Sequence, residues 1–147
     1  MSRDDDARAV WHSLTQLFIS DDNQRRFPDI AEQENVTVRL MHAILDIDPD
    51  EPISMKQLAQ QWYCDASNVT SIVDGLEERG LARRDPSPTD RRVKLVALTG
   101  DGAAVRARIV ERLSDPPSVL MTLTATELKT LRTLLGKAAS RLEAPRG

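Results

Sequence analysis

The fold is decided by one stretch, residues 53–99, which reads ISMKQLAQQWYCDASNVTSIVDGLEERGLARRDPSPTDRRVKLVALT. Ser54 and Gln57 have the Ser-x-x-Gln spacing of a capping box, so a helix of roughly eight residues should begin at Met55. Asp65 is a good N-cap for a second helix of roughly fourteen residues. Only the segment around Tyr63 and Cys64 separates the two, and a connection this short forces the sharp crossing of a helix-turn-helix.

Both helices have an apolar face at helical spacing. The residues of these faces are Met55, Leu58, Ala59 and Trp62 in the first helix and Val69, Ile72, Val73 and Leu76 in the second. Gly80 stands where the second helix should end in a left-handed cap, and Leu81 is the apolar residue that packs behind such a cap.

Two strands should follow, at residues 81–84 and 93–98, the second of them rich in β-branched residues. The segment 85–91 between them contains Pro86 and Pro88, which favours a turn. A helix-turn-helix followed by a hairpin is a winged helix. The predicted fold class is therefore mainly α with a small β-hairpin wing.

Helices are also expected on both sides of the winged helix. Val10, Trp11, Leu14, Leu17 and Phe18 fall on one face of a helix over residues 6–18, and residues 37–47 are helical again. The pattern fails at 20–23, and Phe27-Pro28 is expected to mark a helix boundary or a kink. Residues 48–52 form a loop.

The C-terminal part should contain two more helices. Residues 99–102 cap one that Pro116-Pro117 ends, and Thr124 with Glu127 forms a second capping box. A heptad-like seam follows at Leu128, Leu131, Leu135, Ala138 and Leu142. This seam could pack on its own domain. We expect self-association, because the terminal helices exceed what a winged helix of ~70 residues can cover. The chain 1–147 would then be one domain, with a winged helix-turn-helix DNA-binding lobe at 37–99 and a helical dimerisation lobe from 4–36 and 100–147.

Composition restricts the function. The 147 residues include 40% hydrophobic and 29% charged side chains, as in a globular protein. Cys64 is the only cysteine, and only two histidines are present, so disulfide frameworks and multi-cysteine zinc sites are excluded. Neither a phosphate-binding glycine loop nor a nucleophile–base pair is visible. We therefore expect no enzyme activity, no cofactor and no metal, and a cytoplasmic protein without a membrane span.

Charge is distributed unevenly along a chain whose net charge is −3. Residues 79–94 contain six basic side chains against two acidic ones, a local charge of +4 (Arg79, Arg83, Arg84, Arg91, Arg92 and Lys94 against Asp85 and Asp90). This cluster is either an ordinary solvated turn or a phosphate-binding feature on a molecule whose other surfaces repel DNA. Charge alone does not decide between these two interpretations.

These residues resemble the MarR (multiple antibiotic resistance regulator) family of winged helix-turn-helix transcriptional regulators. The similarity is closest over 53–102, in the segments 58–59, 67–70, 73–81, 90–92 and 95–99. The resemblance implies a homodimer that binds double-stranded DNA at an inverted-repeat operator, most often as a repressor, and that is released or tuned by a small aromatic ligand. The alternative is a winged-helix protein-interaction module that binds no specific DNA sequence.

Three features depart from the family pattern. Tyr63 stands where the family usually has a small residue, and Cys64 stands where it has an aliphatic one. Residues 27–35 match poorly. Some members of the family sense oxidants through cysteine, but the position of Cys64 in the turn indicates a buried core residue.

The candidate DNA contacts lie on the second helix and the wing. The exposed face near the start of that helix should be Ser67, Asn68, Thr70 and Ser71, which can reach base edges or phosphates. Gln57 could donate to a phosphate. By resemblance, Asp90 pairs with Arg92 to shape the wing and Arg91 enters the minor groove, although the sequence leaves the opposite assignment open. Arg84 and Lys94 flank the wing and would hold phosphates, unless they are surface charges.

A ligand site is expected in the crevice between the two lobes, where relatives bind small aromatic acids. Its candidate residues are Trp11, His12, Arg39 and His42. The two histidines could equally be ordinary core or surface residues.

Overall fold

The computed structural model describes residues 2–141 and divides into two compact units on either side of the Ser114–Asp115 bond. The first unit contains α1 (Arg3–Ile19), α2 (Asp21–Gln33), α3 (Val38–Asp46), β1 (Ile53–Ser54), α4 (Met55–Gln61), α5 (Ala66–Glu78), β2 (Ala82–Pro86), β3 (Lys94–Leu98) and α6 (Gly100–Ser114). The second unit contains a short 3₁₀ helix, η1 (Ser118–Thr122), and α7 (Ala125–Ala139).

The winged helix forms as the sequence predicts. The capping box of Ser54 and Gln57 begins α4, and the Asp65 side chain caps α5. Gly80 has a φ of +67°. The Leu81 N–H donates to the Leu76 carbonyl oxygen over 2.9 Å, so α5 ends in the expected left-handed cap. Mainly helical architecture with a small antiparallel sheet is therefore confirmed.

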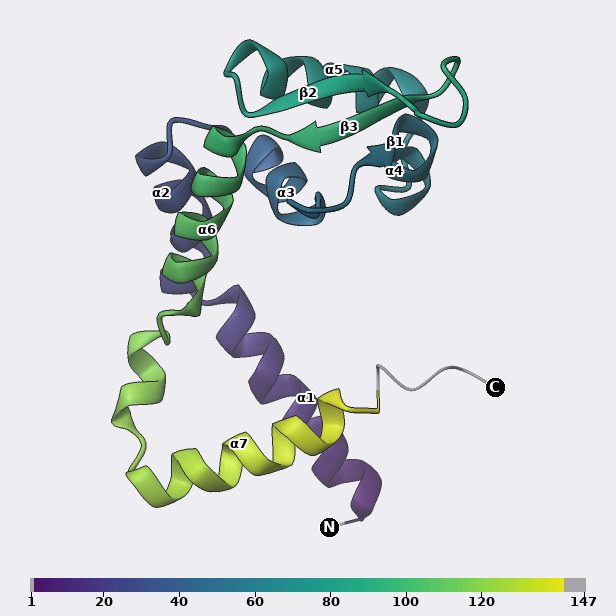
Figure 1. The fold of residues 1–147 in the computed structure, drawn as a ribbon. Helices are drawn as coiled ribbons and strands as arrows, with labels where there is room; N and C mark the ends of the chain where they lie inside the picture. The colour runs from purple at the N-terminus through teal and green to yellow at the C-terminus, as the bar shows by residue number, and fades with distance from the viewer. Residues whose placement is uncertain (1, 142–147) are drawn as a thin grey trace. The chain divides into compact units, whose positions relative to one another are not determined.

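The sheet has the strand order β1-β3-β2 and is antiparallel throughout. β2 and β3 pair from Ala82–Leu98 to Pro86–Lys94, and α5 lies along this hairpin (Figure 1). The two residues of β1, which the sequence analysis did not identify as a strand, pair with Val96 and Leu95. A segment this short carries no alternation that a sequence pattern could detect.

One hydrophobic core joins the helices to the sheet. Its fully buried side chains come from every layer and include Met41, Ile44, Ile47, Leu58, Leu76, Val96 and Ile109. Ile30 and Ala31 of α2 and Val105 of α6 belong to the same core. α2 and α6 are also joined by the buried Glu34 carboxylate, which pairs with Arg108 at 2.8 Å and Arg112 at 3.4 Å.

Of the two alternatives expected at Phe27-Pro28, a helix boundary or a kink, the boundary is wrong. Pro28 lies inside α2, which continues to Gln33, so Phe27-Pro28 is not a helix boundary. Proline removes one backbone donor from the helix. The buried side chains of Ile30 and Ala31 and the half-buried Phe27 fix both sides of the proline against the core, and this packing outweighs the lost hydrogen bond.

The second unit contains the expected capping box, in which Thr124 accepts from the backbone N–H of Glu127. None of the described residues of α7 is buried, and Leu135 of the heptad-like seam is 40% exposed. Leu142 lies outside the described residues. Within residues 2–141, no helix is both long enough and apolar enough to cross a bilayer.

Candidate DNA-binding interface

The N-terminal half of α5 presents a polar face to solvent. Val69, Ile72 and Val73 are buried, so Ser67, Asn68, Thr70 and Ser71 are exposed, as predicted. The Asp65 carboxylate accepts from the Asn68 backbone N–H at 2.8 Å and from the Ser67 hydroxyl at 2.7 Å. These two hydrogen bonds hold the pKa of Asp65 below its ordinary value, and the bond from the Asn68 backbone has the larger effect. The start of α5 is thereby fixed.

The exposed side chains of α5 differ in their remaining hydrogen-bonding capacity. The Thr70 hydroxyl donates to the Ala66 carbonyl oxygen at 2.9 Å, so its proton is engaged within the helix. Asn68 accepts a 2.5 Å hydrogen bond from the Arg39 guanidinium of α3. Ser71 makes no side-chain hydrogen bond to any residue in the range 2–141. Its hydroxyl remains available to a ligand.

The wing is a turn held by its own backbone. The Ser87 N–H donates to the Val93 carbonyl oxygen at 2.8 Å, and the Asp90 carboxylate accepts from the Arg92 backbone N–H at 3.0 Å. Asp90 thus shapes the turn through the backbone of Arg92, and the two side chains form no ion pair in the described part of the chain.

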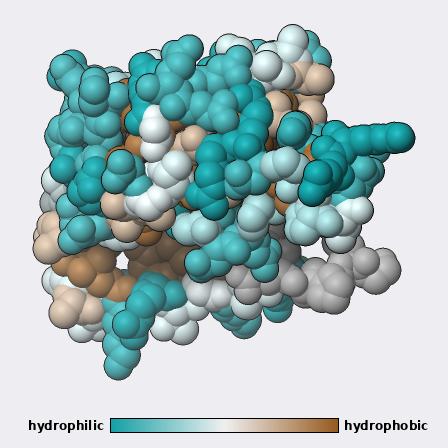
Figure 2. Space-filling view, turned by 45° about the horizontal axis from the view of Figure 1, so that its top comes forward, coloured by the Kyte–Doolittle hydropathy of each residue, from teal (hydrophilic) through white to brown (hydrophobic). Residues whose placement is uncertain are grey.

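The cations of the wing face solvent. Arg91, Arg92 and Lys94 are exposed, and within residues 2–141 none of their side chains has a hydrogen-bond or ion-pair partner. The space-filling view shows a largely hydrophilic surface over α5 and the β2–β3 hairpin (Figure 2). Three uncompensated cations next to a polar helix face form a surface suited to a polyanion.

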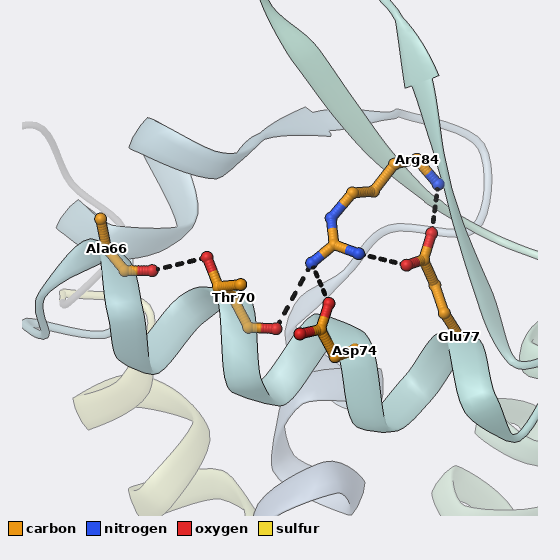
Figure 3. A network of polar contacts seen from close by, with 5 residues as sticks. All are labelled: Ala66, Thr70, Asp74, Glu77 and Arg84. Atoms are coloured by element: carbon orange, nitrogen blue, oxygen red, sulfur yellow. Dashed lines mark hydrogen bonds and ion pairs between the residues drawn. The ribbon is translucent and has the colours of Figure 1, made fainter.

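Arg84 departs from the sequence-based expectation. Its side chain is only 20% exposed and pairs with Asp74 at 2.6 Å and with Glu77, while also donating to the Thr70 carbonyl oxygen at 3.3 Å (Figure 3). The backbone N–H of Arg84 donates to Glu77 as well. Two carboxylates already compensate this guanidinium, and Arg84 joins β2 to α5.

The four residues expected to bind a ligand do not converge on one site. His42 packs edge-on against Phe27, with ring centroids 5.7 Å apart, and lines a cavity of about 380 Å³ formed by α1, α2 and α3. Trp11 is 70% exposed on α1, His12 is also exposed, and neither lines this cavity. Arg39 turns towards Asn68. The aromatic residues Phe18 and Phe27, which sequence reasoning did not include in the site, line the cavity with His42.

The turn between α4 and α5 contains two of the departures from the family pattern. Tyr63 has a φ of +49° and is 96% exposed. Cys64 is partly buried and packs against the core, as its position in the turn suggested. The side-chain oxygen of Gln57 accepts from Ser54 in the capping box.

Comparison with curated proteins relates the chain to transcriptional regulators. The chain is 27% identical over 114 residues to the organic hydroperoxide resistance transcriptional regulator of Bacillus subtilis, covering 76% of this chain and 75% of that protein. It is 34% identical over 91 residues to the HTH-type transcriptional regulator PecS of Dickeya dadantii. That match covers 61% of this chain and 55% of PecS.

Solved structures share the fold. Wild-type MarR from Escherichia coli in its apo form superposes with a TM-score of 0.70 at 25% identity, covering 88% of this chain and 93% of that one. A MepR mutant from Staphylococcus aureus bound to an oligodeoxyribonucleotide gives a TM-score of 0.66 at 19% identity, covering 90% and 98%. The MarR family model matches residues 29–94, which run from the C-terminal part of α2 to the start of β3. This match, and a fold shared with MarR over most of both chains, relate the chain to the MarR family of winged-helix transcriptional regulators.

Proposed function

We propose that this protein is a sequence-specific DNA-binding transcriptional regulator that acts as a homodimer on an inverted-repeat operator, as a repressor relieved by a small aromatic ligand. The observation that carries the proposal is the pairing of an exposed polar helix start with a wing of cations that lack partners within residues 2–141. A helix of this kind fits the major groove, and a wing arginine fits the adjacent minor groove. Binding to chromosomal DNA makes the cytoplasm its site of action.

The residues divide into base-reading and phosphate-binding groups. Ser67, Asn68 and Ser71 at the start of α5 face base edges, and Thr70 offers its remaining lone pairs beside them. Arg91 enters the minor groove, where the negative potential attracts arginine. Arg92 and Lys94 neutralise backbone phosphates on either side of it.

Two surfaces support the homodimer. α1 exposes large apolar side chains, with Trp11 at 70% and Phe18 at 71% exposure, and α7 has no buried residue among those described. A second copy of the chain would cover such surfaces. Two-fold symmetry then presents two copies of α5, so the operator is an inverted repeat with half-sites about 34–36 Å apart.

The cavity beside His42 supports regulation by a ligand. It is lined by aromatic and polar side chains from α1, α2 and α3, and α3 also contacts α5 through Arg39. A ligand that occupies it would act on DNA binding only if it prefers one arrangement of these helices. A tenfold loss of operator affinity requires about 1.4 kcal/mol of coupling, and operator DNA must then weaken ligand binding tenfold in return.

The experiment measures binding to the upstream region of the protein's own gene by fluorescence anisotropy, with unrelated DNA as competitor. Arg91→Ala should lower operator affinity by roughly 5- to 150-fold and reduce the dependence of log K on log salt by about one unit, as expected for the loss of one DNA-contacting cation. Arg25→Ala, which removes an exposed charge from α2, is the matched control and should change neither quantity. If unrelated DNA at equal concentration abolishes binding to the upstream region, the proposal is contradicted and a protein-interaction module is favoured.

A further inference from the structure

The contact between Arg39 and Asn68 joins two helices at the exposed edge of the winged helix. The Arg39 guanidinium of α3 donates to the Asn68 side-chain oxygen of α5 over 2.5 Å, across 29 residues of sequence. Both residues are exposed. Asn68 lies in the first turn of α5, the part of the helix that the proposed function brings to the bases.

The packing of α3 against α5 supports this contact. Leu40, the neighbour of Arg39, is buried against Gly75 of α5, where an added Cβ would lie 3.2 Å from a Leu40 methyl carbon. The absence of a side chain at Gly75 therefore lets the two helices approach closely. The Thr37 side chain caps α3 at its start, which fixes the backbone just before Arg39.

The chemistry of the contact sets the orientation of the Asn68 amide. Arginine has five N–H donors and no acceptor, so it can only bind the oxygen of the amide. Asp65, the acidic residue that begins α5, is already engaged by Ser67 and by the Asn68 backbone. Arg39 forms no ion pair within residues 2–141 and keeps the amide oxygen as its partner. Because this bond turns the amide oxygen towards α3, the NH₂ group of Asn68 is the part that points away from Arg39 and can face a ligand.

An asparagine held in this way reads DNA differently from a free one. A free asparagine recognises adenine through both atoms, because it accepts from N6 and donates to N7. The bond from Arg39 takes one of the two lone pairs of the Asn68 oxygen and turns this atom towards α3, so the NH₂ group is the part that faces the base. An NH₂ group opposite the N6 amino group of adenine has no acceptor there. Guanine presents two acceptors, N7 and O6, on the same edge.

We propose that Arg39 is a specificity-determining residue, which orients Asn68 so that the protein selects guanine at the base facing it. Arg39 thereby belongs to the DNA interface and not to the ligand site expected from the sequence. This inference rests on the proposed function, because it presumes that the start of α5 enters the major groove.

The test measures base preference at one operator position. An operator is first selected from random duplexes with the wild-type protein, and each position is then changed to all four bases. The position facing Asn68 is the one where Asn68→Ala removes discrimination. There the wild-type protein should bind guanine roughly tenfold more tightly than adenine, the size expected for one bidentate pair.

Variants at position 39 separate orientation from charge. Arg39→Ala frees the amide oxygen, so the preference for guanine over adenine should fall to less than twofold or reverse. Arg39→Lys should restore most of it, because the ammonium donates to the same oxygen. In the Asn68→Ala background, Arg39→Ala should have no further effect on base preference. Arg25→Ala controls for the lost charge.

Two results would overturn the inference alone. One is a wild-type preference for adenine at this position. The other is an Arg39→Ala variant that loses affinity by the same factor for all four bases, as a phosphate contact would. If the wild-type protein selects no sequence at all, the proposed function fails and the inference fails with it.

Discussion

Tyr63 holds a backbone conformation that glycine adopts more easily. Its φ of +49° lies in the left-handed region, and the N–H of Cys64 donates to the Ala59 carbonyl oxygen at 3.1 Å to close the end of α4. A bulky side chain is strained there. Because Tyr63 is 96% exposed, no packing compensates for this strain.

Tyr63→Gly should therefore raise the free energy of unfolding by about 0.5–1 kcal/mol, since relief of strain exceeds the added entropy of the unfolded chain. Urea denaturation followed by circular dichroism measures it. Gln60→Gly is the matched control: this exposed residue lies within α4, and the change should cost about 1 kcal/mol. Equal destabilisation by both changes would show that Tyr63 is not strained.

No side chain fits at position 102, because α6 closely approaches the segment before β2 at Gly102. A Cβ at this position would lie 1.9 Å from the Leu81 carbonyl oxygen, whereas one at Gly100 would meet nothing within 4 Å. Thr99 reinforces the approach, because its hydroxyl donates to the Gly80 carbonyl oxygen at 2.6 Å. The backbone must move to admit any side chain at Gly102.

Gly102→Ala should lower the free energy of unfolding by at least about 2 kcal/mol, because it forces backbone displacement in a packed region. Gly100→Ala places the same methyl group in the same helical turn and should be neutral or slightly stabilising. Thermal melts of both variants compare them directly. Similar melting temperatures would mean that α6 can move away from Leu81 without loss.

At the scale of elements, the start of α5 depends on the charge of Asp65. Hydrogen bonds from Asn68 and Ser67 lower the pKa of this carboxyl in the folded protein. A carboxyl whose pKa is lower when folded stabilises the protein at pH values above its unfolded pKa. That stabilisation is lost as the pH falls through the folded pKa.

Asp65→Asn keeps an N-cap but removes the titration. The difference in stability between wild type and Asp65→Asn should therefore be constant from pH 7 to about 5 and should shift against the wild type as the pH falls below about 4. Urea midpoints across this range measure it, and the shared titrations of other groups cancel in the difference. A difference that is independent of pH down to 3 would contradict the role assigned to the carboxylate.

Arg84 couples two elements of the interface. Its contacts with Asp74, Glu77 and the Thr70 carbonyl oxygen join β2 to α5, so Arg84 positions α5 relative to the wing. Arg84→Ala should cost about 1–3 kcal/mol of stability, because it leaves partly buried acceptors without a donor. It should also weaken operator binding.

The salt dependence of binding distinguishes positioning from phosphate contact. For Arg84→Ala the slope of log K against log salt should equal that of the wild type, whereas Arg91→Ala should reduce it by about one. A reduced slope for Arg84→Ala would show that Arg84 contacts a DNA phosphate.

At the scale of the whole molecule, assembly decides whether two winged helices act together. Light scattering should give about twice the 16.4 kDa chain mass. Leu131→Glu with Leu135→Glu, on the seam of α7, should shift the protein towards monomer and weaken binding to a two-half-site operator far more than binding to unrelated DNA. A wild-type monomer at micromolar concentration would rule out both the dimer and the palindromic operator.

The sequence by itself determined the helices and the hairpin of the winged helix, but not β1. The capping box at Ser54, the cap at Asp65 and the left-handed end at Gly80 each depend on residues three to five positions apart, so local hydrogen bonds define them. The exposed polar face of α5 follows from the same local periodicity.

Tertiary structure alone decided the partners of the arginines and the course of α2. Arg84 of β2 meets acidic groups of α5, and Arg39 of α3 meets Asn68 of α5. These contacts join different elements, and the periodicity within one helix or strand does not encode them. Pro28 remains inside a helix because Ile30 and Ala31 are buried in a core formed by other elements. A charged side chain binds whichever groups the fold brings near it, and the sequence pattern records only that the charge is present.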